Sequence, residues 1–537
     1  MGKETQGELK EKQEQEREPK EEQYQEEKPF TFSYTYFIGL FFLMTWVSLF
    51  PSVVAGYFYF YYFPFSLSPL NLLLLIPLFF VLYGIALFTS LVAVKIGIWI
   101  VHKRITYPEL GTYRLSMDEP QTRAFIVKGN VKNFARWLFY FFRLNLLRAF
   151  WLRRMGIKVG KNVKLGKHVE DDDFIEIGDN NYMAKNTVIT GHQINQTTLT
   201  LCRMIIGKNC IFELASGSGG GIIGDNSIFT PVTSGMKGLI CRGNALYHGI
   251  PCKKIGEYSD LSPEAIEEKK RNIKKIDKKD FIKEKNAPIK INEIKLFIIK
   301  IVIVIGGCLF ALLFIYLYIL FFQTFYSPTN HLLNILILTP VPILFLIMLG
   351  AFIAGASITI KLFLLYYDHQ AEVPEGTYEL NDPLAKLFKI KYCLRMFGLR
   401  LIHGTYFKIA DTYVMRLWGN VKLGKNVKMD DAVVDPQYLE IGDFAQVSAC
   451  ARIHTHDIID GKLFIKKVKI GKNVLLGGYV HIKPGVIIAD GSFAGIAAWF
   501  RKNQKCSRRA LWVGKPAVEL PIELVNRIAK AKDKYVD

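Results

Sequence analysis

The chain has 537 residues, which is too long for one hydrophobic core and indicates roughly two to four domains. Half of its residues are hydrophobic and its formal net charge is +21. Because long apolar runs accompany this basic excess, we interpret it as charge that faces a membrane, and no zinc finger or other motif supports nucleic-acid binding. The eight cysteines contain no CxxC pair, so we expect reduced thiols on a cytosolic face and no disulfide framework.

The first 104 residues predict a tail and a membrane hairpin. Residues 1–30 are rich in Glu, Gln and Lys, and we expect a disordered charged tail. Residues 31–104 form the first transmembrane hairpin, because the apolar runs 36–63 and 72–101 can each cross a hydrocarbon core of about 30 Å. The turn between them carries no charge and the second run ends in Lys103 and Arg104, which places both ends of the hairpin in the cytosol.

The remaining non-repetitive segments are helical or connecting in this prediction. Residues 105–155 mix aromatic residues with arginines, so they either lie in the membrane interface or pack as an ordinary amphipathic helix. Residues 259–292 are a charged helical linker that begins at Ser262-Pro263-Glu264. Residues 293–368 form a second transmembrane hairpin, 369–418 a connecting segment, and 522–537 a C-terminal helix or tail.

A six-residue rhythm marks the segments 156–258 and 419–521. In the second segment, aliphatic or small residues recur at every sixth position and the rhythm breaks once: Ile441, Val447 and Ile453, then Ile470, Leu476, Ile482, Ile488 and Ala494. A period of six matches neither an amphipathic helix nor an alternating strand, and it is typical of a three-sided parallel β-helix. The break begins with the sequence HTHD, and a loop that leaves a rigid coil is where we expect chemistry.

The sequence indicates one unit that occurs twice. The sequence IGD at 177–179 recurs at 441–443, GKN at 207–209 recurs at 471–473, and His192 precedes His456, all at an offset of 264 residues. Each hairpin is also followed by the tripeptide GTY. We therefore predict an internal duplication of hairpin, connecting segment and solenoid.

The second solenoid resembles the hexapeptide-repeat acyltransferases, and within them the maltose and galactoside O-acetyltransferases, in the segments HTHDIID, KIGKNVLLGGYVHIKPGV and WVGKPAVEL. The resemblance implies two left-handed β-helix domains in a multidomain membrane protein, with acetyl-CoA or another acyl-CoA as co-substrate and no metal. It places His456 at the position of the catalytic base. It also places a group of residues at the CoA: Gly477, Gly478, Lys483, Gly514, Lys515 and Pro516.

The chemistry explains the residue types. A neutral imidazole takes a proton near pH 7 and contributes roughly 10²–10⁴-fold to the rate. Asp457 or Asp460 is a candidate to fix its tautomer. His192 keeps the position of His456 but has Gln193 and Gln196 where the second copy has these acids, so the first copy is either active or a structural or gating partner.

A zinc hydratase of the γ-carbonic-anhydrase kind would need three histidines, with the last two closely spaced. His456 and His481 are 25 residues apart and no histidine follows closely, which argues against a metal.

A wider resemblance, carried by GTYFKIADTYVMRLWGNVKLGKNV and the alternation of hairpins with hexapeptide domains, is to the C-terminal region of ε-poly-lysine synthetase-like nonribosomal peptide synthetases. That region usually has three domains on six membrane helices. This chain has two such domains and four apolar spans, and it contains no adenylation domain or carrier serine. The implied function is transfer of an acyl or aminoacyl group from a CoA or carrier thioester to a hydroxyl or amine.

The expected partners are the acyl donor, the lipid bilayer and, through the β-helices, further copies of the chain. We expect an integral, multi-pass protein with both termini and both β-helices in the cytosol. The rival interpretation is a non-catalytic membrane scaffold whose paired β-helices bind another protein.

Overall fold

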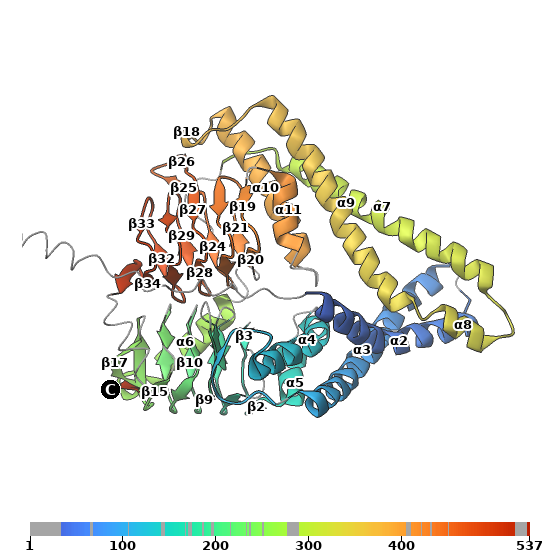
Figure 1. Cartoon of the computed structure of the whole chain (residues 1–537), viewed down its shortest axis with the longest axis horizontal. Helices are drawn as coiled ribbons and strands as arrows, with labels where there is room; N and C mark the ends of the chain where they lie inside the picture. Colours follow the sequence, from blue (N-terminus) through green and yellow to red (C-terminus); the bar gives the residue numbers. More distant parts are fainter. Residues whose placement is uncertain are drawn as a thin grey trace, which may run out of the picture.

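Two coils of short strands and two pairs of long helices make up the computed structural model (Figure 1). The structure describes residues 34–536 apart from 65–67, 106, 141–144, 167, 170–173, 185–186, 195–197, 215, 232, 236–237, 250–251, 277–288, 404–409, 420, 430–431, 449 and 521–533. The predicted tail at 1–30 lies outside these residues. Each half of the chain contains, in order, a long helix pair, a GTY strand, two shorter helices and a coil.

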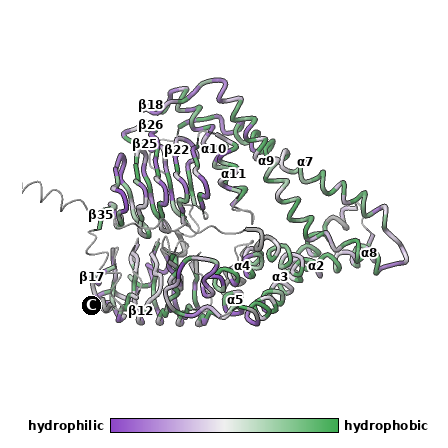
Figure 2. The backbone as a smooth tube through the Cα atoms, viewed as in Figure 1, coloured by the Kyte–Doolittle hydropathy of each residue, from purple (hydrophilic) through white to green (hydrophobic). Residues whose placement is uncertain are grey.

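The long helices are α2 (Tyr34–Tyr62), α3 (Pro69–Arg104), α7 (Glu293–Phe325) and α9 (Val341–Gln370), and the short α8 (His331–Ile337) lies in the second turn. Within the described residues, four spans are long and apolar enough to cross a membrane: 39–62, 73–103, 293–325 and 331–370. This agrees with the two predicted hairpins, and Figure 2 shows that hydrophobic residues predominate along these helices. A helix keeps every backbone hydrogen bond within itself, as a hydrocarbon environment requires.

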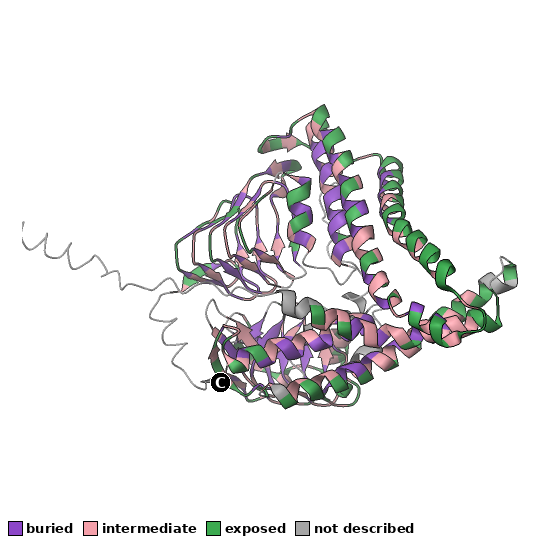
Figure 3. Ribbon diagram, turned by 45° about the vertical axis from the view of Figure 1, so that its right-hand side comes forward, coloured by how far each residue is buried: buried purple, intermediate pink, exposed green. Residues whose placement is uncertain are grey.

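The second hairpin is longer than a membrane needs. The 30 residues of α9 extend about 45 Å, against a hydrocarbon core of about 30 Å. Its buried residues cluster in the half nearer the coil, whereas the outer part of α9 is mostly half-buried and that of α7 mostly exposed (Figure 3). The inner half of α9 therefore serves as a stalk that the two helices preceding the second coil pack against.

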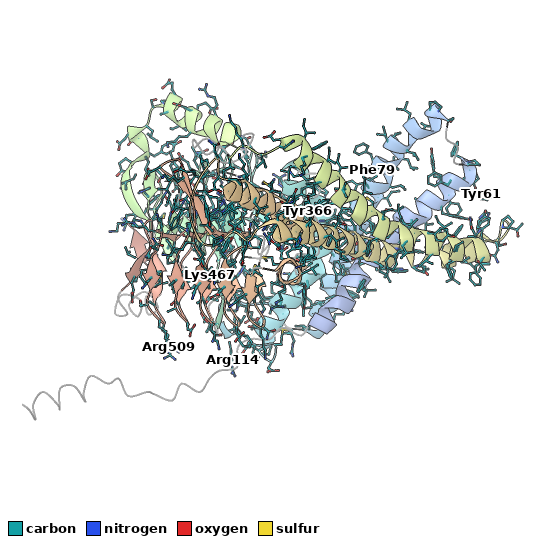
Figure 4. The ribbon with its side chains drawn as sticks, turned by 90° about the horizontal axis from the view of Figure 1, so that it is seen from above. Tyr61, Phe79, Arg114, Tyr366, Lys467 and Arg509 are labelled. Atoms are coloured by element: carbon teal, nitrogen blue, oxygen red, sulfur yellow. The ribbon has the colours of Figure 1, made fainter. Side chains whose placement is uncertain are left out.

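Small residues let α7 and α9 cross closely, because a Cβ at Gly355 would lie 2.7 Å from the carbonyl oxygen of Gly306. The two helix pairs also meet near their far ends. There the Tyr57 hydroxyl is 3.0 Å from Nδ1 of His331, and Trp46 Nε1 donates to the carbonyl of Thr339 at 2.7 Å. Figure 4 labels Tyr61 and Phe79 on the first pair, and Lys467 and Arg509 on the second coil at the opposite side of the molecule.

Two helices follow each GTY strand. In the first half β1 (Gly111–Arg114) precedes α4 (Pro120–Tyr140) and α5 (Asn145–Met155). In the second half β18 (Gly376–Glu379) precedes α10 (Pro383–His403) and α11 (Ala410–Trp418). Phe134 and Trp151 are buried within the protein. Residues 369–418 contain helices where we predicted only a connection.

The first coil has three parallel sheets among its described residues, with strands in the orders β2-β4-β9-β12-β15, β5-β10-β13-β16 and β3-β6-β11-β14. Its strands are β2 (Lys158–Val159), β3 (His168–Val169), β4 (Ile175–Ile177), β5 (Tyr182–Met183), β6 (Val188–Thr190), β9 (Met204–Ile206), β10 (Ile211–Phe212), β11 (Gly217–Gly219), β12 (Gly221–Ile223), β13 (Ile228–Phe229), β14 (Ser234–Gly235), β15 (Leu239–Cys241) and β16 (Ala245–His248). The antiparallel β17 (Lys253–Glu257), a short 3-10 helix (Tyr258–Asp260) and α6 (Pro263–Ile276) end it, and Ser262 Oγ accepts from Ala265 N at 3.2 Å, which supports the predicted helix start.

The second coil has the same arrangement, with parallel orders β19-β22-β27-β30-β33, β20-β23-β28-β31-β34 and β21-β24-β29-β32. Its strands are β19 (Val421–Leu423), β20 (Lys428–Met429), β21 (Val433–Val434), β22 (Leu439–Ile441), β23 (Gln446–Val447), β24 (Arg452–Ile453), β27 (Val468–Ile470), β28 (Leu475–Leu476), β29 (His481–Ile482), β30 (Ile487–Ile488), β31 (Phe493–Ala494), β32 (Trp499–Phe500), β33 (Lys505–Cys506), β34 (Leu511–Val513) and the antiparallel β35 (Val518–Leu520). The residues of the six-residue rhythm point inward, since each from Ile441 to Ala494 is at most 3 % exposed.

The repeated turn motifs have a structural reason. Asn473 of GKN adopts a φ of 53°, a left-handed conformation that asparagine tolerates better than most residues. Asp443 of IGD accepts a hydrogen bond from Lys425 N at 2.7 Å, which links one turn of the coil to the one before it.

Each coil is interrupted by an antiparallel hairpin that pairs with the GTY strand. In the second half this hairpin is β25 (His456–Ile459) and β26 (Lys462–Ile465), and β26 pairs with β18. In the first half it is β7 (His192–Ile194) and β8 (Thr198–Leu201), paired with β1.

The described part of the C-terminal segment is the strand β36 (Lys534–Val536), which joins β15 of the first coil, where we expected a helix or tail.

Candidate active site

A histidine–aspartate pair lies where the second coil is interrupted. His456 opens β25, and its Nδ1 is 2.6 Å from Oδ2 of Asp435. Asp435 follows β21, which pairs with β24, so the coil itself brings the two residues together. The same carboxylate accepts the hydroxyl of Thr455 at 2.6 Å and the backbone N–H of Gln437 at 3.2 Å. A carboxylate held by three donors has a fixed orientation.

Asp435 is only 2 % exposed. Burial on its own raises the pKa of this carboxyl, but the hydrogen bond and charge of His456, and the hydrogen bonds of Thr455 and Gln437, outweigh it, so the net shift of the pKa is downward. An ionised Asp435 accepts a hydrogen bond from the N–H at Nδ1 of His456, so Nε2 is the ring nitrogen that can accept a proton. That is the tautomer a general base needs.

Helix α10 covers one side of this histidine. The rings of Phe388 and Tyr392 meet the imidazole edge-on, with centroids 5.0 and 4.7 Å away. These contacts restrict rotation of the imidazole, and the side chain of His456 remains 15 % exposed. The site is therefore made jointly by the coil and by a helix that packs on the membrane stalk.

A row of rings extends from the pair along the β24-β29-β32 face. The ring centroid of His454 is 5.0 Å from that of His481, which stacks on Trp499 at 4.6 Å. Lys515 places its Nζ 3.9 Å above the Trp499 ring. Burial lowers the pKa of His454 to about 4 and that of His481 to about 3, with smaller contributions from a neighbouring histidine in each case and from Lys483 and Arg452. Both rings are neutral at pH 7.

The structure brings some of the predicted residues together and separates others. Asp460 lies exposed at the tip of the β25–β26 hairpin with a φ of 49°, and the carboxylate bound to His456 is that of Asp435. The other candidate for fixing the imidazole tautomer, Asp457, pairs instead with Lys483 at 2.9 Å, which fixes that lysine beside the hairpin.

The predicted CoA-binding residues lie in turns of the second coil. Gly477 donates its N–H to the carbonyl of Ala494 at 2.8 Å, and Gly478 accepts from Ala497 N at 2.8 Å. Gly514 follows β34, and the peptide bond between Lys515 and Pro516 is cis. Of this group, Lys515 joins the row of rings and Lys483 joins the hairpin, whereas the two glycines near 477 serve the turn itself.

The first half repeats part of the arrangement. His192 opens β7, and the ring of Phe125 from α4 lies 5.2 Å from it, as Phe388 lies against His456. Asp171 stands 21 residues before His192, the same separation as between Asp435 and His456, but it lies outside the described residues.

The sequence contained a signal for Asp435 that we missed. Asp171 and Asp435 share the 264-residue offset that related the two histidines, so comparing acids across the repeat would have found them. Nothing in the sequence pattern pointed to Phe388 and Tyr392, which reach the site through packing of α10. Among the described residues, no group of three His, Cys, Asp or Glu side chains is arranged to hold a metal ion.

No protein-family model and no curated protein matches the sequence. Solved structures similar to part of the chain include a maltose O-acetyltransferase from Clostridium difficile 630, with 24% identity over 28% of this chain and 92% of that one, at a TM-score of 0.24. A galactoside acetyltransferase in complex with coenzyme A shows 17% identity over 25% of this chain and 78% of that one, at 0.20. A soybean serine acetyltransferase apoenzyme shows 14% identity over 33% and 74%, at 0.15. At these TM-scores the likenesses do not establish the function of this chain.

Proposed function

We propose that this protein is a membrane-tethered acyltransferase that moves an acyl or aminoacyl group from a CoA or carrier thioester to a hydroxyl or amine. The observation that carries the proposal is the hydrogen bond between Asp435 and Nδ1 of His456, which leaves Nε2 as a proton acceptor. A buried, oriented acid behind a histidine is the arrangement that acyl transfer uses to activate a weak nucleophile.

In this mechanism, Nε2 of His456 takes the proton of the acceptor as its oxygen or nitrogen attacks the thioester carbonyl carbon. The carbon–sulfur bond then breaks, and the imidazolium returns the proton to the departing thiolate, so the histidine is regenerated. Asp435 stabilises the imidazolium in between. Lys483 and Lys515 lie near the hairpin and the row of rings, where their charge can attract the phosphates of a CoA donor.

The membrane helices place this chemistry at a lipid surface. We infer that both coils are left-handed, that the two halves arose by duplication, and that both coils lie on the cytosolic side as domains at 156–258 and 419–521. His192, with its matching Phe125 contact, supports a second or supporting site in the first coil. Self-association of the coils would then bring neighbouring sites together.

Labelled donors test this proposal. The detergent-solubilised chain is incubated with radiolabelled acetyl-CoA, and separately with a longer acyl-CoA, together with broken-cell extract as the source of acceptors. The His456→Ala variant is expected to lose roughly 10²–10⁴-fold of the labelling rate, whereas Asp460→Asn, at the hairpin tip, retains it. Equal labelling by the wild type and His456→Ala, or none by the wild type with either donor, would contradict the proposal and favour the scaffold.

A further inference from the structure

A fully buried arginine, Arg395, lies on α10 one turn after Tyr392, which contacts His456. Arg395 has no exposed surface, and its Nε, Nη1 and Nη2 make no hydrogen bond within the described part of the chain. Buried guanidinium groups are normally paired, because an uncompensated charge in a protein interior is costly. With all three nitrogens shielded from solvent, a ligand has no access to them, so the arginine must act on neighbouring protein groups.

Helix geometry directs this side chain toward the histidine–aspartate pair. Phe388, Tyr392 and Arg395 follow the spacing i, i+4 and i+7, which places them on one face of α10. The first two touch the His456 ring. The acids whose charges act on the guanidinium are Asp368 at the end of α9 and Asp435.

Asp368 and Asp435 differ in whether a cation pairs with them directly. Lys391, on the same helix, is 2.8 Å from Asp368 and also donates to the carbonyl of Ala371 at 3.0 Å. Asp368 therefore already has a direct cation, whereas the hydrogen-bond partners of Asp435 among the described residues are His456 and two neutral donors. Burial lowers the pKa of Arg395 to about 10, so it still carries its charge at neutral pH.

The first half has a cation at the same place. α4 and α10 are both 21 residues long, and Lys132 lies seven residues after Phe125 as Arg395 lies seven after Phe388. Lys132 is 3 % exposed. A buried cation behind a ring that touches the hairpin histidine thus occurs in both halves.

We propose that Arg395 is a positioning residue for the proposed general base: its charge holds Asp435 ionised and opposes protonation of His456, so the histidine stays an acceptor at neutral pH. The inference rests on the proposed function for its purpose, but not for its test. It also gives α9 and α10 a role in setting the site, since the same helix pairs with the membrane stalk through Lys391 and Asp368.

The other charged and titratable groups around the pair must be considered in any pH dependence. They are His454 and the Asp457–Lys483 pair from the coil and hairpin, Tyr392 and Lys391 from α10, Asp368 from α9, and Tyr438 of the coil, on which Glu372 and Tyr378 act. None of these changes in an arginine variant, so the comparison between variants isolates Arg395.

The experiment measures ethoxyformylation of His456 by diethyl pyrocarbonate, which attacks only the neutral imidazole, as a function of pH. The full chain in detergent is used, and peptide mass spectrometry reads His456 directly. In Arg395→Met the midpoint of the rate is expected to rise by about one pH unit, because a nearby cation no longer opposes protonation. Arg395→Lys keeps the charge and stays near the wild type. Arg400→Met, an exposed arginine on the same helix, is the matched control and leaves the midpoint unchanged.

An unchanged midpoint in Arg395→Met, or an equal shift in Arg395→Lys, would overturn the inference. If Arg395→Met does not fold, Asp368→Asn decides instead. That variant removes an anion beside Lys391 and Arg395, so the midpoint must fall, and a midpoint that stays or rises refutes the role of Arg395. Because the readout needs no turnover, a missing acyltransferase activity with these shifts intact would sink the proposed function alone.

Discussion

The buried histidines beside the site predict a specific sensitivity to acid. His481 and His454 are neutral in the folded chain, with pKa values of about 3 and about 4 against 6.5 when exposed. As the pH falls below 6.5, the unfolded chain takes up protons that the folded chain cannot, so stability is lost from pH 6.5 down to about pH 4 for His454 and about pH 3 for His481. From pH 7 to pH 5 the loss in the free energy of unfolding is at most about 2 kcal/mol for each ring, because solvent that reaches a partly exposed ring reduces the effect.

The substitution His481→Phe isolates this effect. A phenyl ring keeps the stack on Trp499, and Nε2 of His481 makes no hydrogen bond among the described residues that the substitution would remove. Thermal unfolding followed by tryptophan fluorescence at pH 7 and pH 5 gives the acid-induced loss for each protein. The variant is expected to lose a few degrees less than the wild type, while His369→Phe, an exposed control, behaves as the wild type. An equal acid loss in His481→Phe and wild type would refute the assignment of neutral buried histidines.

Three further predictions concern activity and packing. Asp435→Asn is expected to lower the rate of acyl transfer by roughly 10²–10⁴-fold with little change in the KM for the donor, because it affects the base and not the donor site. Asp460→Asn should stay within about twofold of the wild type under the same assay, because its surface position makes a large effect unexpected. Gly355→Val should lower the melting temperature and the yield of folded protein, since its Cβ meets the Gly306 carbonyl at 2.7 Å, whereas Gly350→Val, with open space around it, should not.

The parts of the fold that follow from local periodicity could be predicted from the sequence. The membrane spans follow from runs of apolar residues longer than about 20, and inward positions such as Ile470 and Leu476 follow from the six-residue rhythm. The interruption after Ile453 likewise marked the hairpin that carries His456.

The parts of the fold and of the site that depend on long-range packing could not be predicted from the sequence. Helices α10 and α11 are stabilised by apolar residues that pack on α9 and the coil. One of them is Trp418, whose Nε1 donates to the carbonyl of Ser357 at 3.2 Å. Asp435 is 21 residues from His456, because a coil brings side chains together from one full turn away, whereas the predicted partners Asp457 and Asp460 are its neighbours in sequence. The strand at 534–536 has no local signal, since it exists through its pairing with β15 of the other half.

The location of a bound donor tests the central claim most directly. A cryo-electron microscopy structure of the full chain with a non-hydrolysable acetyl-CoA analogue would show where the acyl carbon lies. We predict that it lies beside His456, with room for an acceptor atom about 3 Å from Nε2, and that the phosphates lie toward Lys483 or Lys515. A donor bound away from His456 and His192, or no binding at concentrations that saturate CoA-dependent acyltransferases, would contradict the account.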